Sequence, residues 1–206
     1  MSLATVFSRA NVGIHAPQVV VETHLSNGLP QFTIVGLPET AVKESKDRVR
    51  SALMQSGYEF PKKRITVNLA PADLPKEGGR FDLPIAISIL LASKQLFCPH
   101  IDQYEFAGEL ALGGALRPVK GILPFALATQ KMKRQLIIAE GNADEATWVS
   151  PLPIFAMANF TSVCAHVSGH LPHLPAQPAH FVQAQETEIP CLSQVCGQHH
   201  AKRALE

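Results

Sequence analysis

The sequence has few cysteines, few aromatic residues and no long apolar run. Its four cysteines are spread widely over 206 residues, unlike the dense disulfide frameworks of small secreted domains. Residues 1–14 carry one basic residue and no long apolar segment, which is not typical of a signal peptide. The longest apolar-rich stretch, residues 83–92, falls short of the ~20 residues that a membrane span needs. These absences predict a soluble, cytoplasmic protein with reduced thiols and no membrane contact.

An excess of charge of one sign is also absent. Lys and Arg number 18 and Asp and Glu number 17, for a formal net charge of +1. This balance excludes a chain that binds nucleic acid through bulk charge, so any such binding needs a local patch. With 46% hydrophobic residues the chain can bury a full core, and we expect one or two globular domains.

Strand and helix patterns alternate along the chain, which predicts an α/β fold. Residues 19–25 and 31–35 are rich in β-branched residues and flank a turn, which predicts a hairpin. Pro38 begins a helical pattern to residue 56, and Asp82 is placed to cap a buried helix through residue 91. The remaining predictions are strands at 64–69, 105–112, 114–119, 135–139 and 154–156, and helices at 121–132, 142–148 and 159–167, the last capped by Asn159.

The composition changes after residue 168. Histidine and proline become frequent and apolar periodicity disappears, which is typical of a linker. From residue 189 the sequence again has a pattern typical of folded structure, and its last residues predict the first turns of a helix. We therefore expect a core domain over residues 1–169, a Pro/His-rich linker over 170–188 and the start of a second domain over 189–206.

Three segments resemble a known family: FTIVGLPETAVKESKDRVR at residues 32–50, NLAPADLPKEGGRFDLPI at 68–85 and AGELALGGALRPVKGILP at 107–124. They are similar to the N-terminal domain of the magnesium-chelatase-like AAA+ ATPases, over about residues 1–169. The resemblance implies a Lon-protease-like domain, in which a mixed sheet packs with helices as in domain 2 of a small-subunit ribosomal protein. It also implies that residues 189–206 begin an AAA+ ATPase domain.

The resemblance further implies a full-length ATP-dependent DNA helicase that acts on branched intermediates in natural transformation of bacteria. Its cofactors would be ATP and Mg, and its partners DNA, further copies in a homo-oligomer and the AAA+ domain of the same chain. These 206 residues contain no GxxxxGK[ST] phosphate loop, so we expect no cofactor site within them. Two alternatives stay open: an ATPase subunit of a magnesium chelatase in tetrapyrrole metabolism, and a Lon-like peptidase domain.

The peptidase alternative depends on two positions. Lon-type peptidases use a Ser nucleophile and a Lys base. The resemblance places Arg80 at the Ser position and Leu123 at the Lys position. Leucine has no titratable group, and Arg stays protonated at physiological pH. We therefore expect no catalytic residue and no peptidase activity.

Two basic segments are candidates for phosphate contact. Residues 43–64 carry seven basic and three acidic residues, and Lys62, Lys63 and Arg64 have few carboxylates near them in sequence. Lys76 and Arg80 precede a helix N-terminus, which also favours anions. An alternative explanation is that the basic residues of the first segment form a solvent-exposed helix face and that those of the second form an ion pair within the loop. We predict weak, salt-sensitive DNA binding through these five residues.

The C-terminal segment contains cysteine and histidine residues that could bind zinc. Cys191, Cys196, His199 and His200 have a spacing within the range of zinc ligands. The family that the chain resembles has no zinc site there, and the preceding linker is rich in proline. We therefore expect no metal site.

Overall fold

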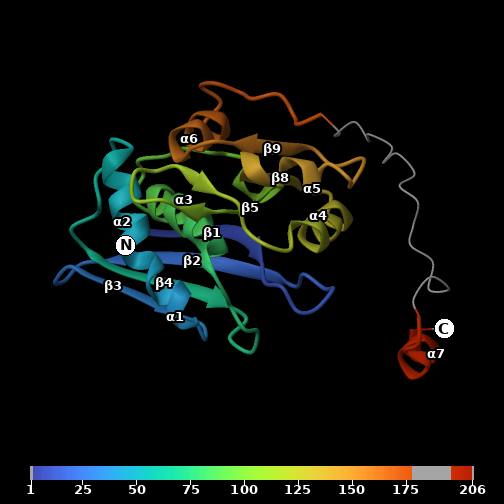
Figure 1. Cartoon of the computed structure of the whole chain (residues 1–206). Helices are drawn as coiled ribbons and strands as arrows, with labels where there is room; N and C mark the ends of the chain where they lie inside the picture. Colours follow the sequence, from blue (N-terminus) through green and yellow to red (C-terminus); the bar gives the residue numbers. More distant parts are fainter. Residues whose placement is uncertain (1, 178–195, 206) are drawn as a thin grey trace.

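A seven-stranded mixed sheet forms the centre of the protein (Figure 1), seen in a computed structural model that describes residues 2–177 and 196–205. The strand order is β3-β4-β2-β1-β5-β8-β9, and four of the six neighbouring pairs are parallel. The strands are β1 (Ser2–Arg9), β2 (Gln18–Ser26), β3 (Gln31–Val35), β4 (Arg64–Ala70), β5 (Tyr104–Ala107), β8 (Gln135–Ala139) and β9 (Ile154–Met157). A small antiparallel ladder joins β6 (Glu109–Leu110) to β7 (Leu116–Arg117). The predicted α/β class with a mixed sheet and packed helices is confirmed.

The helices pack on both faces of the sheet. These helices are α1 (Thr40–Lys43), α2 (Ser45–Gln55), α3 (Asp82–Ala92), α4 (Ile122–Lys131), α5 (Ala143–Ala146) and α6 (Phe160–Val167), with short 3-10 turns at Gly79–Phe81, Ile101–Gln103 and Glu140–Asn142. A further helix, α7 (His199–Leu205), belongs to the second described segment. Ten of the eleven residues of α3 are buried, which confirms the predicted central helix. It packs on β1, β2 and β5 and against α2.

Alternation along the strands separates two hydrophobic cores. In β8, Ile137 faces the core that contains α3 and α6, whereas Leu136 and Ile138 face the core beneath α4 and α5. In β2 and β4, buried residues alternate with half-exposed ones. The half of the sheet made by these two strands therefore buries one face, against α3.

The predicted hairpin between residues 19–25 and 31–35 is wrong. β4 lies between β2 and β3, antiparallel to the first and parallel to the second. The hairpin is instead made by β2 with β1, a strand that the sequence analysis missed. β1 ends in two buried polar residues, Ser8 and Arg9, which hide its apolar alternation.

Several boundaries also differ from the predictions. The helix expected over 38–56 is two helices that meet at Glu44. The strand expected over 105–112 ends at Ala107, and the next residues form the β6–β7 ladder. Asp82 is the first residue of α3 and makes no capping bond to it. Asn159 does cap α6, because its Oδ1 accepts from the Ser162 backbone N–H at 2.9 Å.

The chain beyond α6 stays in contact with the sheet as far as residue 176. The Leu171 backbone N–H donates to the Ala165 carbonyl, and the Ala176 N–H donates to the Ile154 carbonyl of β9. The domain boundaries at 169 and 188 stay predictions. Within residues 2–177 and 196–205, no helix has the length and apolar character to cross a membrane.

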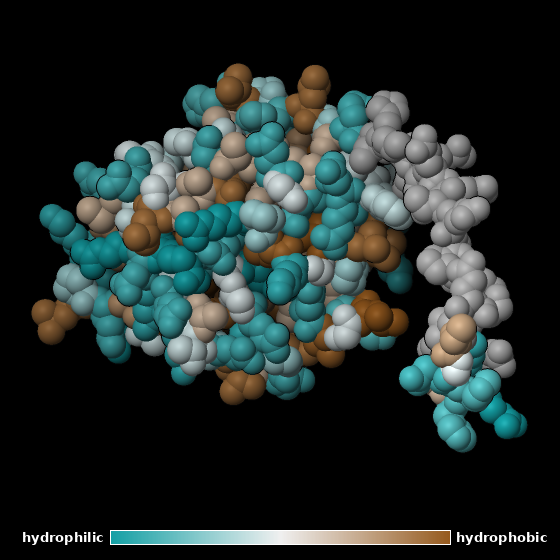
Figure 2. Space-filling model, viewed as in Figure 1, coloured by the Kyte–Doolittle hydropathy of each residue, from teal (hydrophilic) through white to brown (hydrophobic). Residues whose placement is uncertain are grey.

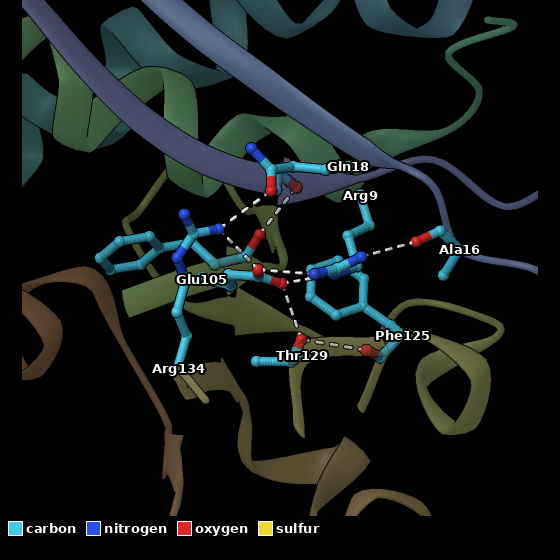
Figure 3. A network of polar contacts seen from close by, with 9 residues as sticks. Arg9, Ala16, Gln18, Glu105, Phe125, Thr129 and Arg134 are labelled. Carbon is cyan, nitrogen blue, oxygen red and sulfur yellow. Dashed lines mark hydrogen bonds and ion pairs between the residues drawn. The ribbon is translucent and has the colours of Figure 1, made fainter. Parts of the chain in front are cut away.

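A buried ion network joins the two halves of the sheet (Figure 3). The carboxylate of Glu105, on β5, accepts from Arg9 Nε at 2.5 Å and Nη2 at 2.7 Å, from Thr129 Oγ1 at 2.7 Å and from Arg134 Nη1 at 3.0 Å. The Arg134 guanidinium also lies 3.8 Å from the ring centroid of Phe7. Glu105 is fully buried, so this carboxylate depends on its two guanidinium partners.

Replacing Glu105 by alanine will leave the Arg9 guanidinium buried without its carboxylate. Removing one partner of a buried ion pair costs about 3–5 kcal/mol, and we expect that loss in the free energy of unfolding measured by urea denaturation. Arg117→Ala is the control, because its ion pair with Glu109 is exposed and is worth about 1 kcal/mol at most. Equal, small losses for both variants would contradict this account of the network.

Candidate nucleic-acid interface

Lys62 and Lys63 lie in the loop that joins α2 to β4, and both are exposed. They line a groove of about 1110 Å³ where β1 begins, β2 ends and β3 begins. Arg50 from α2 and Lys94 from the loop after α3 line the same groove. Four cations from three separate segments thus meet there, and Glu59 is the only carboxylate among the described residues that line the groove. In Figure 2, hydrophilic side chains gather at this end of the molecule, on the left.

Aromatic side chains lie between these cations. The rings of Phe32 and Phe60 are 5.8 Å apart, and the Arg50 guanidinium lies 5.3 Å from the Phe60 centroid. The Tyr58 ring also lines the groove and packs edge-on against Phe160. Cations interleaved with aromatic rings are typical of surfaces that bind single-stranded nucleic acids.

One glutamine joins the two loops that carry the lysines. The Gln95 side chain accepts from the backbone N–H of Glu59 and donates to the carbonyl of the same residue, each at 2.8 Å. This pair of bonds fastens the loop after α3 to the loop after α2. The positions of Lys94 and of the Lys62–Lys63 segment are therefore coupled.

Part of this positive charge has a second explanation. α2 and α3 both end at the groove, and helix C-termini carry a partial negative charge that attracts cations. Lys94 follows the end of α3 and so complements its dipole. Lys62 and Lys63 are further from a helix end in sequence, so the helix dipoles explain their positions less well.

Arg64 lies apart from the two lysines. It is the first residue of β4, and its neighbour Ile65 points into the core. Because successive side chains of a strand point to opposite faces, Arg64 lies on the half-exposed face with Thr66 and Asn68. Of the three consecutive cations, the structure brings only Lys62 and Lys63 into the groove.

Lys76 and Arg80 are buried in the loop ahead of α3. The ammonium of Lys76 donates to the Pro71 carbonyl, and desolvation lowers its pKa. Arg80 is 8% exposed and donates from Nη2 to the Lys120 carbonyl at 3.0 Å, while its Nη1 finds no hydrogen-bond partner among the described residues. Burial also lowers the pKa of Arg80. A phosphate would reach these groups only if the loop moved, and DNA contact through them stays a prediction.

The two segments expected at the Lon dyad positions lie side by side. Arg80 bonds to the carbonyl of Lys120, three residues before Leu123 in the first turn of α4. Leu123 is half-buried, and its backbone N–H donates to Glu145 Oε1 at 2.9 Å. The side chain of Asn11, which the sequence analysis missed, donates to the same Lys120 carbonyl. The resemblance assigned these two positions to the dyad, and their side chains are a guanidinium and an isobutyl group, neither of which is a hydroxyl nucleophile or an amine base.

Asp82 is engaged by α2 and not by its own helix. Its carboxylate accepts from Arg48 at 2.6 and 3.1 Å and from the Leu110 backbone N–H at 3.1 Å. Burial raises the pKa of Asp82 to about 6, although the hydrogen bond and charge of Arg48 act in the opposite direction. The sequence analysis gave a solvated face as one interpretation of residues 43–64, which include Arg48, and nothing in the spacing of Arg48 from Asp82 indicates this contact.

Of the expected zinc segment, Cys191 lies outside the described residues, whereas His199 and His200 begin α7. In the described ranges, no three His, Cys, Asp or Glu side chains come together as a metal site. The expectation about metal therefore stays a prediction.

Comparison with known proteins identifies the family. A family model described as subunit ChlI of Mg-chelatase matches residues 21–142, more than half of the chain. The chain belongs to this magnesium-chelatase-like family, as its sequence motifs predicted.

The similarity to two of the relatives extends over the whole chain. It is 54% identical over 210 residues to competence protein ComM of Haemophilus influenzae, covering all of this chain and 41% of that protein. It is 49% identical over 207 residues to the uncharacterised protein YifB of Escherichia coli, covering all of this chain and 40% of YifB. A more distant relative, the uncharacterised protein Mb2921c of Mycobacterium bovis, is 36% identical over 155 residues, which are 75% of this chain and 31% of that protein. The chain therefore spans about two fifths of the length of ComM and YifB.

The Asp82 carboxyl should titrate with a midpoint near pH 6 in side-chain ¹³C NMR of the folded protein. Since this lies above the ordinary value of 3.8, the folded state binds the proton more tightly than the unfolded state. The resulting stabilisation is present below about pH 4 and is lost as the pH rises through 6. Arg48→Met should move the midpoint further up, whereas Lys131→Met on α4 should leave it unchanged. A midpoint near 4 in the wild type would contradict the dominance of burial.

Proposed function

We propose that this chain is the N-terminal, Lon-protease-like domain of an AAA+ protein that remodels DNA in an ATP-dependent manner during natural transformation. The observation that carries the proposal is the 54% identity to competence protein ComM over all of this chain. In this proposal the domain itself is not catalytic. The helicase or branch-migration motor belongs to an AAA+ domain, with ATP and Mg as its cofactors, in a cytoplasmic homo-oligomer.

The cationic groove supports a part for this domain in holding DNA. Lys62 and Lys63 are exposed and lie on one groove with Arg50 and Lys94. Phosphates would bind these cations independently of sequence, releasing counterions, so the affinity would fall as salt rises. The partners of the domain would then be DNA and the AAA+ domain of the same chain.

A magnesium chelatase subunit is the second candidate, and the family description itself favours it. Disruption of the gene distinguishes the two functions. Loss of transformation with normal tetrapyrrole levels supports DNA remodelling, and the reverse result supports the chelatase. The peptidase alternative is disfavoured by Arg80 and Leu123. It would be supported if the chain hydrolysed casein and Arg80→Ala abolished that hydrolysis.

The isolated chain should bind DNA weakly at low salt, and Lys62→Glu combined with Lys63→Glu should reduce that binding at least tenfold in fluorescence anisotropy. The reason is that two favourable phosphate contacts become repulsive. The substitutions are exposed, so each should change the free energy of unfolding by about 0.5 kcal/mol at most. Arg64→Glu is the matched control and should retain most of the affinity, because Arg64 lies on another face. Unchanged binding in the double variant would contradict a phosphate contact at Lys62 and Lys63.

ATP at millimolar concentration should leave the melting temperature of this chain unchanged. A ligand without a site in the folded state gives no stabilisation by linkage, and these residues contain no phosphate loop. Differential scanning fluorimetry with and without ATP and Mg tests this. A clear upward shift would reveal a nucleotide site and contradict the assignment of ATP binding to another domain.

A further inference from the structure

Phe97 is an exposed aromatic residue between two buried neighbours. Its side chain is 77% exposed, whereas Leu96 and Cys98 on either side of it are buried. It follows the loop that carries Lys94 and Gln95 at the edge of the cationic groove. An aromatic ring left in water at this place has no role in the packing of the core.

Phe97 lines a second hollow that continues the first. This hollow, of about 460 Å³, lies between the loop after α3 and residues of α6. It shares Tyr58, Lys94 and Gln95 with the cationic groove. The two hollows therefore meet at these three residues and form one track, which runs from Lys62 and Lys63 to Phe97.

We propose that this track binds single-stranded nucleic acid, with Lys62, Lys63, Arg50 and Lys94 contacting phosphates and Phe97 stacking on an unpaired base. The inference rests on the proposed function and deepens it by naming the strand state that the domain holds. Charge complementarity selects a polyanion, since one carboxylate, that of Glu59, faces four cations. The exposed ring selects the single-stranded form, because the bases of a duplex are already stacked on each other.

The geometry of the track also suits a backbone that is held at several points. The bonds of Gln95 to Glu59 fix the junction of the two hollows. Arg50 is held over the Phe60 ring, so its guanidinium is oriented before any ligand binds. Binding then costs less ordering of side chains than at a set of free surface lysines.

The experiment compares fluorescein-labelled oligo-dT with a mixed-sequence duplex of equal length, by anisotropy with the whole 206-residue chain at low salt. We expect tighter binding of oligo-dT than of the duplex. Phe97→Ala should weaken oligo-dT binding by about 5- to 150-fold, the range for loss of one stacked base, without changing the salt dependence. Lys94→Gln should instead lower the slope of log K against log salt by about 0.7, the value for one phosphate contact of a single strand.

Three further variants separate stacking from other effects. Phe97→Trp should preserve the affinity, and its fluorescence should change on binding of oligo-dT. Glu59→Gln should tighten binding, because the carboxylate repels phosphates. Leu127→Ala removes an exposed apolar side chain on α4 and should have no effect.

Tighter duplex binding, or unchanged oligo-dT affinity in Phe97→Ala, overturns the inference while leaving the proposed DNA function in place. Absence of any binding by the wild-type chain also overturns it, and the gene-disruption experiment then decides the proposed function independently. If Phe97→Ala alters the sedimentation mass of the chain but not its affinity for oligo-dT, the ring belongs to a contact between protein chains and the inference fails.

Discussion

The buried carboxylate of Glu105 is the constraint on which the arrangement of the sheet depends. Strands β3, β4, β2 and β1 make one half, β5, β8 and β9 make the other, and β1 meets β5 through a single registered pair, Phe7 with Glu105. So short a ladder is weak by itself. The two guanidiniums that converge on Glu105 come from opposite sides of this seam, one from β1 and one from the segment between α4 and β8. The seam is thus joined by charge where its backbone hydrogen bonds are few.

The groove depends in turn on how α2 and α3 are held together. At the first residue of α3, Asp82 binds Arg48 of α2. Beyond the other end of both helices, Gln95 binds the backbone of Glu59. Polar contacts therefore join α2 and α3 at both ends, and the apolar packing lies between them. Together they set the separation of the loops that carry the cations. A change at Asp82 would therefore act on a surface at the far end of α3.

Sequence reasoning succeeded where the determining contacts are local. The amphipathic pattern of α4, the apolar run of β8 and the Asn159 cap of α6 each lie within one short segment, and all were predicted. The order of the strands was missed because β2 pairs with β1 and β4 through contacts that no local pattern encodes. Lys62 and Lys63 were found as a charge run in the same basic segment as Arg50, but nothing links them in sequence to Lys94 or Phe97. The separate position of Arg64 could have been predicted from the sequence, because Arg64 and Ile65 are neighbours in a strand and must point to opposite faces of the sheet.

The path of the chain after α6 has a mechanical consequence. Residues 171–176 bond to the end of α6 and to β9, an edge strand of the sheet. Tension transmitted along the chain from α7 would enter the core at these few bonds and would act first on β9. The first residues of β3, which line the groove, belong to the opposite edge. Such a force would detach the edge strand β9 from the sheet before it deformed the surface around Lys62 and Lys63.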